Sequence, residues 1–286
     1  MPIDPSVAIG AELPAQEFSW TGSDVQLYHL GLGAGARPTD AGELRYLRDG
    51  DPQVLPTFAT VAATFHATEP PKVSFPGVEI DLAKVVHGSQ EIVVHRPIPA
   101  SGSGRTVTRV AEAWDKGKAA VIVQESTTED ADGEPLWTAR SSIFARGEGG
   151  FGGERGPSEA VDYPEREPDA EFDVPTLPQQ ALLYRLCGDR NPLHSDPEFA
   201  KNAGFPAPIL HGLCTYGTVC KAVTDRLLDA DVSRVAGFRA RFAGVVFPGE
   251  TLRVRVWNEG DRLLATAAVV DRDLAPALAD VVLTVS

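Results

Sequence analysis

The chain has 286 residues, of which 43% are hydrophobic and 23% charged, a composition typical of soluble folded proteins and long enough for two domains of about 100–150 residues each. Its formal net charge of −14 argues against nucleic acid or an anionic membrane as a partner, because both select a basic surface. The three cysteines lack C-x-x-C spacing, the N-terminus lacks a signal-peptide layout, and no window approaches roughly 18 consecutive apolar residues. We therefore expect a cytoplasmic protein without a disulfide framework, zinc ribbon or membrane span.

The first predicted unit covers residues 1–145. An apolar stretch begins at Phe58 and soon meets Pro70-Pro71 and then Pro76, and paired prolines stop a helix, so the sequence predicts only a short helix there. Four segments with the composition of strands follow, namely EIVVH, TVTRVAEAW, KAAVIVQE and LWTARSSIFA. This unit is predicted to be a helix followed by an antiparallel sheet.

Residues 146–180 are dense in Gly, Pro and acidic residues and show no sustained apolar period, which predicts a linker. The second unit, residues 181–286, contains an apolar stripe at helical spacing from Gly212 to about Leu228. Beyond it, Phe238, Ala240 and Phe242 alternate with arginines, as in a half-buried strand, and three more strand candidates follow. Both units thus read as a helix followed by strands, an α+β arrangement.

The two units resemble each other internally. The segment LYHLGLGAGARPTD from Leu27 is similar to LYRLCGDRNPLHSD from Leu183. More loosely, VLPTFATVAATF from Val54 is similar to PILHGLCTYGTVC from Pro208, which places Thr57 opposite Gly212. This alignment sets Gly33, Gly35 and Pro38 opposite Asp189, Asn191 and His194, which predicts that only the second unit can transfer protons.

The stretch from Tyr184 to Pro197 carries the densest chemistry, with Asp189, Asn191 and His194 within six residues of Gly- and Pro-rich chain. A carboxylate, an amide and an imidazole on one loop can hold a water for general acid–base catalysis, although these residue types also occur in ordinary turns. A calcium loop is excluded, because Leu193 stands at a ligand position and His194 where glycine is needed.

A dinucleotide-binding loop is the other alternative, since Gly31-Leu-Gly33-Ala-Gly35-Ala36 satisfies G-x-G-x-x-A. Pro38 follows immediately, and no amphipathic helix begins there to receive a phosphate. The segment is instead the repeat counterpart of the Asp189 loop.

The run LYRLCGDRNPLHSDPEFAKNAGFPAPILHGLCTYG resembles the hydratase motif of the MaoC-like, or type 2, enoyl-CoA hydratases. The resemblance extends over the whole chain and implies a double hotdog fold with a degenerate first repeat. It implies reversible hydration of trans-2-enoyl-CoA to (R)-3-hydroxyacyl-CoA without a metal or an organic cofactor. The family's catalytic Asp and His fall on Asp189 and His194, its supporting Asn on Asn191, and its oxyanion-hole glycine on Gly212. Cys187 departs from the Ser usual before Gly-Asp, which affects packing rather than chemistry.

These positions also make chemical sense, because hydration of a conjugated thioester needs a water attacking C3 and a proton delivered to C2. Asp189 and His194 can share this work, and the sequence leaves open which of them takes the water proton. Asn191 is expected to orient the water. A backbone N–H at Gly212, at a helix start, is expected to stabilise the thioester oxygen. His211 is expected to be a structural hydrogen-bonding residue rather than a catalyst.

Arginine suits CoA phosphates geometrically. The candidate contacts for the CoA moiety are Arg190, Arg239 and Arg241, followed by His87, Gly88, Lys116 and Lys118. Two other functions remain open, a hotdog thioesterase and a non-catalytic acyl-CoA-binding module, and the protein is expected to be a monomer or homodimer. The short first helix predicts room for a bulky acyl group, and the chain is similar to actinobacterial steroid side-chain hydratases. A steroid side-chain CoA ester is therefore the preferred substrate, with long or branched enoyl-CoA second.

Overall fold

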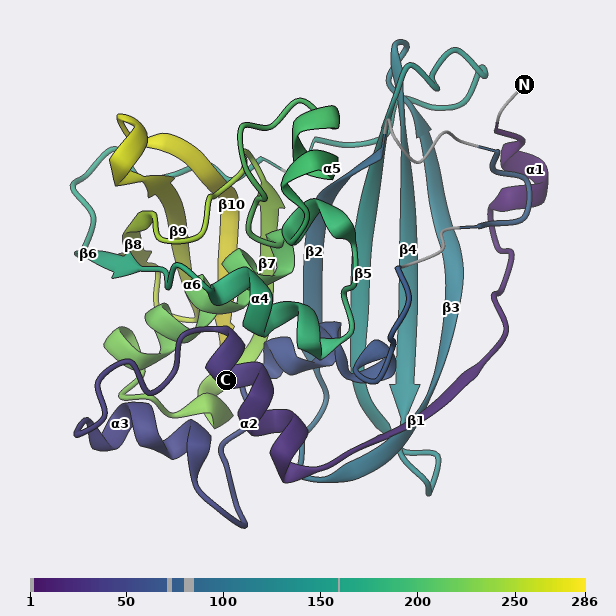
Figure 1. The fold of residues 1–286 in the computed structure, drawn as a ribbon. Helices are drawn as coiled ribbons and strands as arrows, with labels where there is room; N and C mark the ends of the chain where they lie inside the picture. The colour runs from purple at the N-terminus through teal and green to yellow at the C-terminus, as the bar shows by residue number, and fades with distance from the viewer. Residues whose placement is uncertain (1–2, 71–73, 80–84, 159) are drawn as a thin grey trace.

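The computed structural model describes residues 3–70, 74–79, 85–158 and 160–286, so Pro71 of the predicted helix stop lies outside the described residues. The described strands form one antiparallel sheet with the order β1-β3-β4-β5-β2-β7-β10-β9-β8-β6 (Figure 1). Their bounds are β1 Gln16–Trp20, β2 Val85–Val94, β3 Gly102–Asp115, β4 Ala119–Glu129, β5 Pro135–Arg146, β6 Ala170–Pro175, β7 Val235–Phe242, β8 Thr251–Asn258, β9 Arg262–Val269 and β10 Ala275–Val285. All four strand candidates of the first unit are confirmed as strands.

The sheet contains the same five-strand pattern twice. In each half, the first strand along the chain (β1 or β6) lies at an outer edge of the sheet, and the second (β2 or β7) lies at the junction between the halves. At this junction β2 pairs with β7 from Ser89↔Arg241 to Val93↔Gly237. β6 falls inside the range predicted as linker, yet it pairs with β8 along its length. The sheet of the second half therefore begins at Ala170, and the segment before it carries no helix or strand in its described residues.

Short helices and one long helix cover one face of this sheet (Figure 1). The helices are α1 Pro5–Ala8, α2 Gly22–Gly31, α3 Ala41–Leu44, α4 Gln180–Tyr184, α5 Pro197–Asn202 and α6 Gly212–Leu227, with 3-10 turns η1 Arg45–Leu47, η2 Pro56–Thr60, η3 Ala62–Thr64, η5 Arg185–Cys187, η6 Pro192–His194, η7 Val232–Arg234 and η8 Val270–Arg272. None of the described helices has the length and apolar composition needed to cross a membrane.

Helix α6 is the centre of the second half. Its predicted apolar stripe is confirmed, since Tyr216, Val219 and Val223 are buried, and the Tyr216 hydroxyl donates to the Phe238 carbonyl oxygen at 2.5 Å. We call the face of the sheet that packs on α6 the inner face. Phe238, Ala240 and Phe242 lie on it, because alternate strand residues point to the same side.

The first half has no such helix at the equivalent place. The stretch from Pro56 to Thr64 forms only the two 3-10 turns η2 and η3, and they end before Pro70 is reached. The helix is therefore not merely shorter than α6, as predicted, but is replaced by turns. Pro56 starts the first turn, and Val61, with φ −120°, separates the two.

The opposite, outer face carries a charge ladder across the junction. Register places Arg109, Glu125, Arg140, Glu91 and Arg239 side by side on five consecutive strands, with alternating charge. Arg109 and Glu125 are 2.6 Å apart. Because side chains alternate between the two faces along a strand, residues two positions from a ladder residue also lie on the outer face. The residues directly before and after a ladder residue lie on the inner face.

Candidate active site

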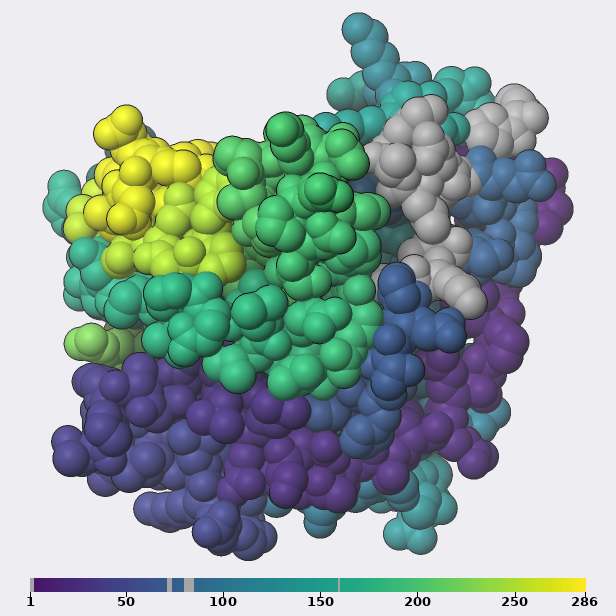
Figure 2. Space-filling view, in the orientation of Figure 1, coloured from purple at the N-terminus to yellow at the C-terminus, as the bar shows by residue number. Residues whose placement is uncertain are grey.

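The predicted catalytic loop leaves η5 through Gly188, which has a left-handed φ of 109°. A Cβ at this position would lie 2.0 Å from the Thr64 carbonyl oxygen, so only glycine fits between the loop and η3 of the first half. Arg190 Nε donates to the Ala67 carbonyl oxygen at 3.1 Å. Figure 2 shows the loop segment of the second half lying directly on the N-terminal half. Both halves therefore fix the position of Asp189.

Side-chain to backbone hydrogen bonds give this loop its shape. The backbone N–H of Asn191 donates to Asp189 Oδ1 at 3.1 Å, and Leu193 N–H donates to Asn191 Oδ1 at 3.0 Å. Asn191 thus caps the 3-10 turn that carries His194, which is how short polar side chains fix turns. Its amide group remains as a donor. Asn191 therefore holds His194 in place while offering a hydrogen bond to a bound water.

His194 is held in one tautomer. The residue is 7% exposed, and Nδ1 lies 2.8 Å from the Ile209 carbonyl oxygen. Because a carbonyl only accepts, Nδ1 carries the hydrogen and the neutral ring keeps a lone pair on Nε2. Burial lowers the pKa of His194 from its ordinary value, and the charge of Asp189 offsets part of that effect. His194 is therefore a neutral imidazole able to accept a proton.

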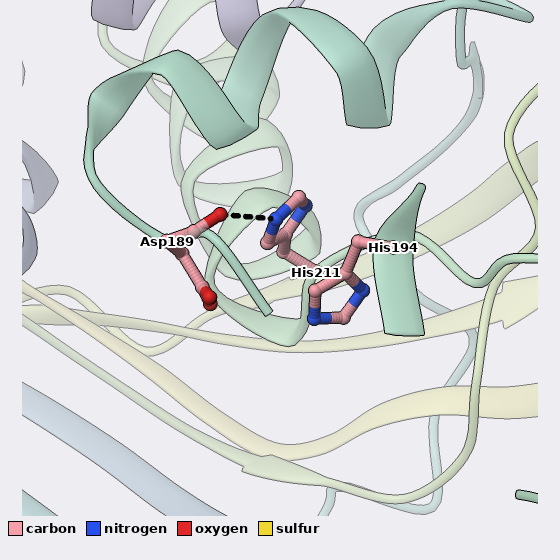
Figure 3. A group of neighbouring side chains, drawn as sticks. All are labelled: Asp189, His194 and His211. Atoms are coloured by element: carbon pink, nitrogen blue, oxygen red, sulfur yellow. Dashed lines mark hydrogen bonds between the residues drawn. The ribbon is translucent and has the colours of Figure 1, made fainter. Parts of the chain in front are cut away.

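His211, predicted from the sequence to be a structural hydrogen-bonding residue, lies beside these residues. Its Nε2–H donates to the backbone carbonyl of Asp189 at 3.3 Å, and its ring stacks on His194 with centroids 3.7 Å apart. One ligand-type atom from each of Asp189, His194 and His211 lies within 4.8 Å of the others (Figure 3). Burial and the neighbouring His194 lower the pKa of His211 to about 2, so it stays neutral.

The same three residues are poorly arranged for a metal ion. A metal accepts the in-plane lone pairs of histidines, and these must converge on one point. The planes of His194 and His211 differ by only 28° in a stacked pair, so their lone pairs do not converge. The ring contact and the carbonyl hydrogen bonds favour acid–base chemistry at this cluster.

Gly212 begins α6 directly after His211, and no side chain caps this helix start. The first turn of a helix presents free N–H groups and a partial positive charge. A Cβ on Gly212 would lie 3.1 Å from the Phe242 ring, so the absent side chain keeps the backbone accessible beside this ring. The predicted oxyanion donor is therefore adjacent in the chain to a member of the acid–base cluster.

The predicted CoA contacts do not gather at the cluster. Gly88, Arg239, Arg241 and Lys116 line a cavity of about 370 Å³ on the outer face, where Arg241 pairs with Asp280 at 2.5 Å. His87 points to the inner face, because Gly88 forms a bulge, and its ring lies 4.6 Å from that of Phe242. Lys118 does not line this cavity. Arg190 instead ties the catalytic loop to the first half.

Comparison with known proteins shows the family to which the chain is similar. Residues 18–147 match the model of the MFE-2 hydratase 2 N-terminal domain, and residues 159–275 match that of the MaoC like domain. The chain is 63% identical over 281 residues to enoyl-CoA hydratase ChsH3 of Mycobacterium tuberculosis, covering 98% of both chains.

Solved structures show the same fold. The crystal structure of a MaoC-like dehydratase from Phytophthora capsici matches with a TM-score of 0.88 and 30% identity, over 99% of this chain and 98% of that one. A Mycobacterium tuberculosis protein described as a double hotdog matches with a TM-score of 0.58 and 13% identity, over 99% and 96%. The predicted α+β double hotdog fold is confirmed.

Proposed function

The chain belongs to the MaoC-like enoyl-CoA hydratase family, and we propose that it adds water reversibly to trans-2-enoyl-CoA to give (R)-3-hydroxyacyl-CoA. The observation that carries this proposal is the fixed tautomer of His194, whose free Nε2 belongs to the same cluster as the Asp189 carboxylate. A water bound between them would meet a neutral base and a carboxylate, with the Asn191 amide as a further partner.

The reaction then follows in balanced steps. One member of the Asp189–His194 pair takes a proton from water as the oxygen bonds to C3, and the π electrons shift through C2 toward the thioester oxygen. The Gly212 N–H and the α6 dipole stabilise the negative charge on that oxygen. The pair returns a proton to C2, so water is added without any external reductant, oxidant or cofactor.

A thioesterase would direct the same water at the thioester carbon, and a binding module would leave the substrate unchanged. An assay with trans-2-enoyl-CoA separates the three functions. Hydration lowers the enoyl-thioester absorbance without releasing thiol, hydrolysis releases free thiol, and binding does neither. Chiral analysis should give the (R) product, and release of thiol or an (S) product would contradict the proposal.

For the CoA moiety, we propose that its phosphates meet Arg239 and Arg241 at the outer cavity. The strand pairing between β2 and β7 ends at Ser89↔Arg241, close to Gly88 of the cavity lining and His87 of the inner face. We propose that the pantetheine passes the end of this pairing to reach Gly212. Arg239→Ala should raise KM for enoyl-CoA more than it lowers kcat, and an unchanged KM would reject this contact.

We also propose that the acyl group occupies the first half and is bulky, a steroid side-chain ester in preference to a long or branched fatty acyl chain. The replacement of a central helix by η2 and η3 supports this substrate class. The kcat/KM values for crotonyl-CoA, a long-chain enoyl-CoA and a steroid side-chain enoyl-CoA test this substrate class, and a preference for crotonyl-CoA would reject it.

We propose that each chain has one active site, so one molecule of a tight substrate analogue should bind per chain. The protein is proposed to act in the cytoplasm as a monomer or homodimer.

A further inference from the structure

The inner face of the first-half sheet carries a group of neutral polar side chains where a core would be expected. Register places Gln90 of β2 opposite Ser141 of β5, and Ser141 opposite Gln124 of β4. On the next inner row, Ser126 of β4 lies opposite Thr108 of β3. We call Thr108, Gln124 and Ser126 the distal polar group, because they lie on β3 and β4, which β5 and β2 separate from β7 and the catalytic half.

The equivalent positions of the second half are apolar. By the repeated strand order, β8 and β9 correspond to β3 and β4. There Val254 pairs with Ala267 and Val256 with Ala265, and all four are at most 1% exposed. The second half covers its inner face with α6, whereas the first half has only η2 and η3. Polar residues therefore occur on the inner face of the half that lacks the helix.

The distal polar group is only partly satisfied by the protein. Among the described residues, Thr108 and Gln124 have no side-chain hydrogen-bond partner, while Ser126 Oγ donates to the Ala139 carbonyl oxygen at a long 3.4 Å. All three side chains remain partly exposed, although Ile122 and Trp137, on the same face to either side, are buried. Because the three side chains are partly exposed, their free donors and acceptors are accessible to a ligand that binds over this face.

The location suits the far end of a large acyl group. The inner row of Gln124, Ser141 and Gln90 leads back across the junction to Ala240 of β7, two residues before Phe242, whose ring lies beside Gly212. Neighbouring strands lie about 4.8 Å apart, so β4 is roughly 10 Å and β3 roughly 14 Å beyond β2. At the near end, His87 Nε2 is buried without a partner. A flat, ring-sized acyl group would span this distance, whereas a crotonyl group would not reach it.

We propose that the distal polar group binds an oxygen substituent, a hydroxyl or a ketone, on the end of the acyl group remote from the thioester. Gln124 can donate to or accept from such an oxygen, and Thr108 and Ser126 offer hydroxyls beside it. This inference rests on the proposed hydration of a bulky enoyl-CoA and adds the chemical feature that selects among bulky substrates.

The test compares two polycyclic enoyl-CoA esters that differ only in a remote ring ketone. The wild-type protein should have a higher kcat/KM for the ketone ester than for the other ester. Gln124→Leu should lower the ratio of these two kcat/KM values about tenfold, as loss of one hydrogen bond implies. Ser126→Ala should act in the same direction. Thr127→Val is the matched control, because Thr127 is exposed on the other face of β4 and should change nothing.

Crotonyl-CoA turnover distinguishes the possible failures. Turnover of crotonyl-CoA should be unchanged in Gln124→Leu, and this result would also show that the variant is folded. If Gln124→Leu does not fold, the preference of Ser126→Ala for the ketone ester tests the inference instead. Equal wild-type kcat/KM for the two polycyclic esters, or an equal loss on both in the variants, would overturn the inference while leaving hydration intact. A wild-type protein that hydrates no enoyl-CoA would instead reject the proposed function.

Discussion

The imidazole rings of His194 and His211 stack with centroids 3.7 Å apart and planes 28° from parallel. Each ring donates one N–H to a backbone carbonyl, of Ile209 and of Asp189 respectively. The two rings cannot both be protonated without strong repulsion, and burial lowers the pKa of each of them. The stack therefore keeps His194 in the form that accepts a proton.

The pH dependence of turnover should reflect this arrangement. Burial lowers the pKa of His194 below 6.5, and protonation removes the lone pair on Nε2. We therefore expect kcat/KM for hydration to hold as pH falls through 6.5 and to decline only at lower pH. A pH–rate profile measures this, and a half-maximal point above pH 6.5 would contradict the account. In Asp189→Asn, which removes the charge that raises this pKa, the decline of the residual activity should shift to still lower pH.

Metal removal should leave the activity intact. The stacked histidine rings cannot direct both lone pairs to one ion, so the cluster is expected to work without a metal. Dialysis against EDTA, followed by the hydration assay, checks this. Loss of activity that returns on adding a divalent cation would show that the cluster holds a metal.

Gly188→Ala should disrupt both folding and activity. The new methyl group would lie 2.0 Å from the Thr64 carbonyl oxygen on a backbone with φ of 109°, which combines a steric clash with backbone strain. We expect a loss of several kcal/mol in stability and a displaced Asp189. Gly204→Ala is the control, because Gly204 has a φ of 89° with no neighbour within 4 Å, and should cost only about 1 kcal/mol. Equal melting temperatures for the two variants would refute the close contact.

Lys221 offers a test of how the two halves are joined. Its ammonium is buried, 3.2 Å from Glu43 of the first half and 2.7 Å from Asp225. Lys221→Met would leave these carboxylates without their cation, which costs on the order of 3–5 kcal/mol. The exposed pair of Arg255 and Glu171 is the comparison, and Arg255→Met should cost less than about 1 kcal/mol. Urea unfolding measures both, and a neutral Lys221→Met would show that this ion pair does not stabilise the join.

The sequence was informative where the chemistry is local. The proximity of Asp189, Asn191 and His194 was predictable because they lie on one short loop, and the buried face of α6 was predictable from its spacing. The stacking of His211 on His194 was not predictable, because only the packing of α6 against the loop brings the two rings together. β6 was assigned to the linker because prolines and acids obscured its alternation, although Phe172 and Val174 alternate with Glu171 and Asp173. The pairing of β2 with β7 depends on tertiary contacts that no local pattern encodes.

The most direct test of the account is the rate of enoyl-CoA hydration in Asp189→Asn, His194→Gln and the double variant, each checked for folding by its melting temperature. If the two residues act as one acid–base pair, each single change should lower kcat/KM by on the order of 10² or more, and the double variant should be little worse than either. Near-normal turnover in either single variant, or losses that multiply in the double variant, would contradict the pair.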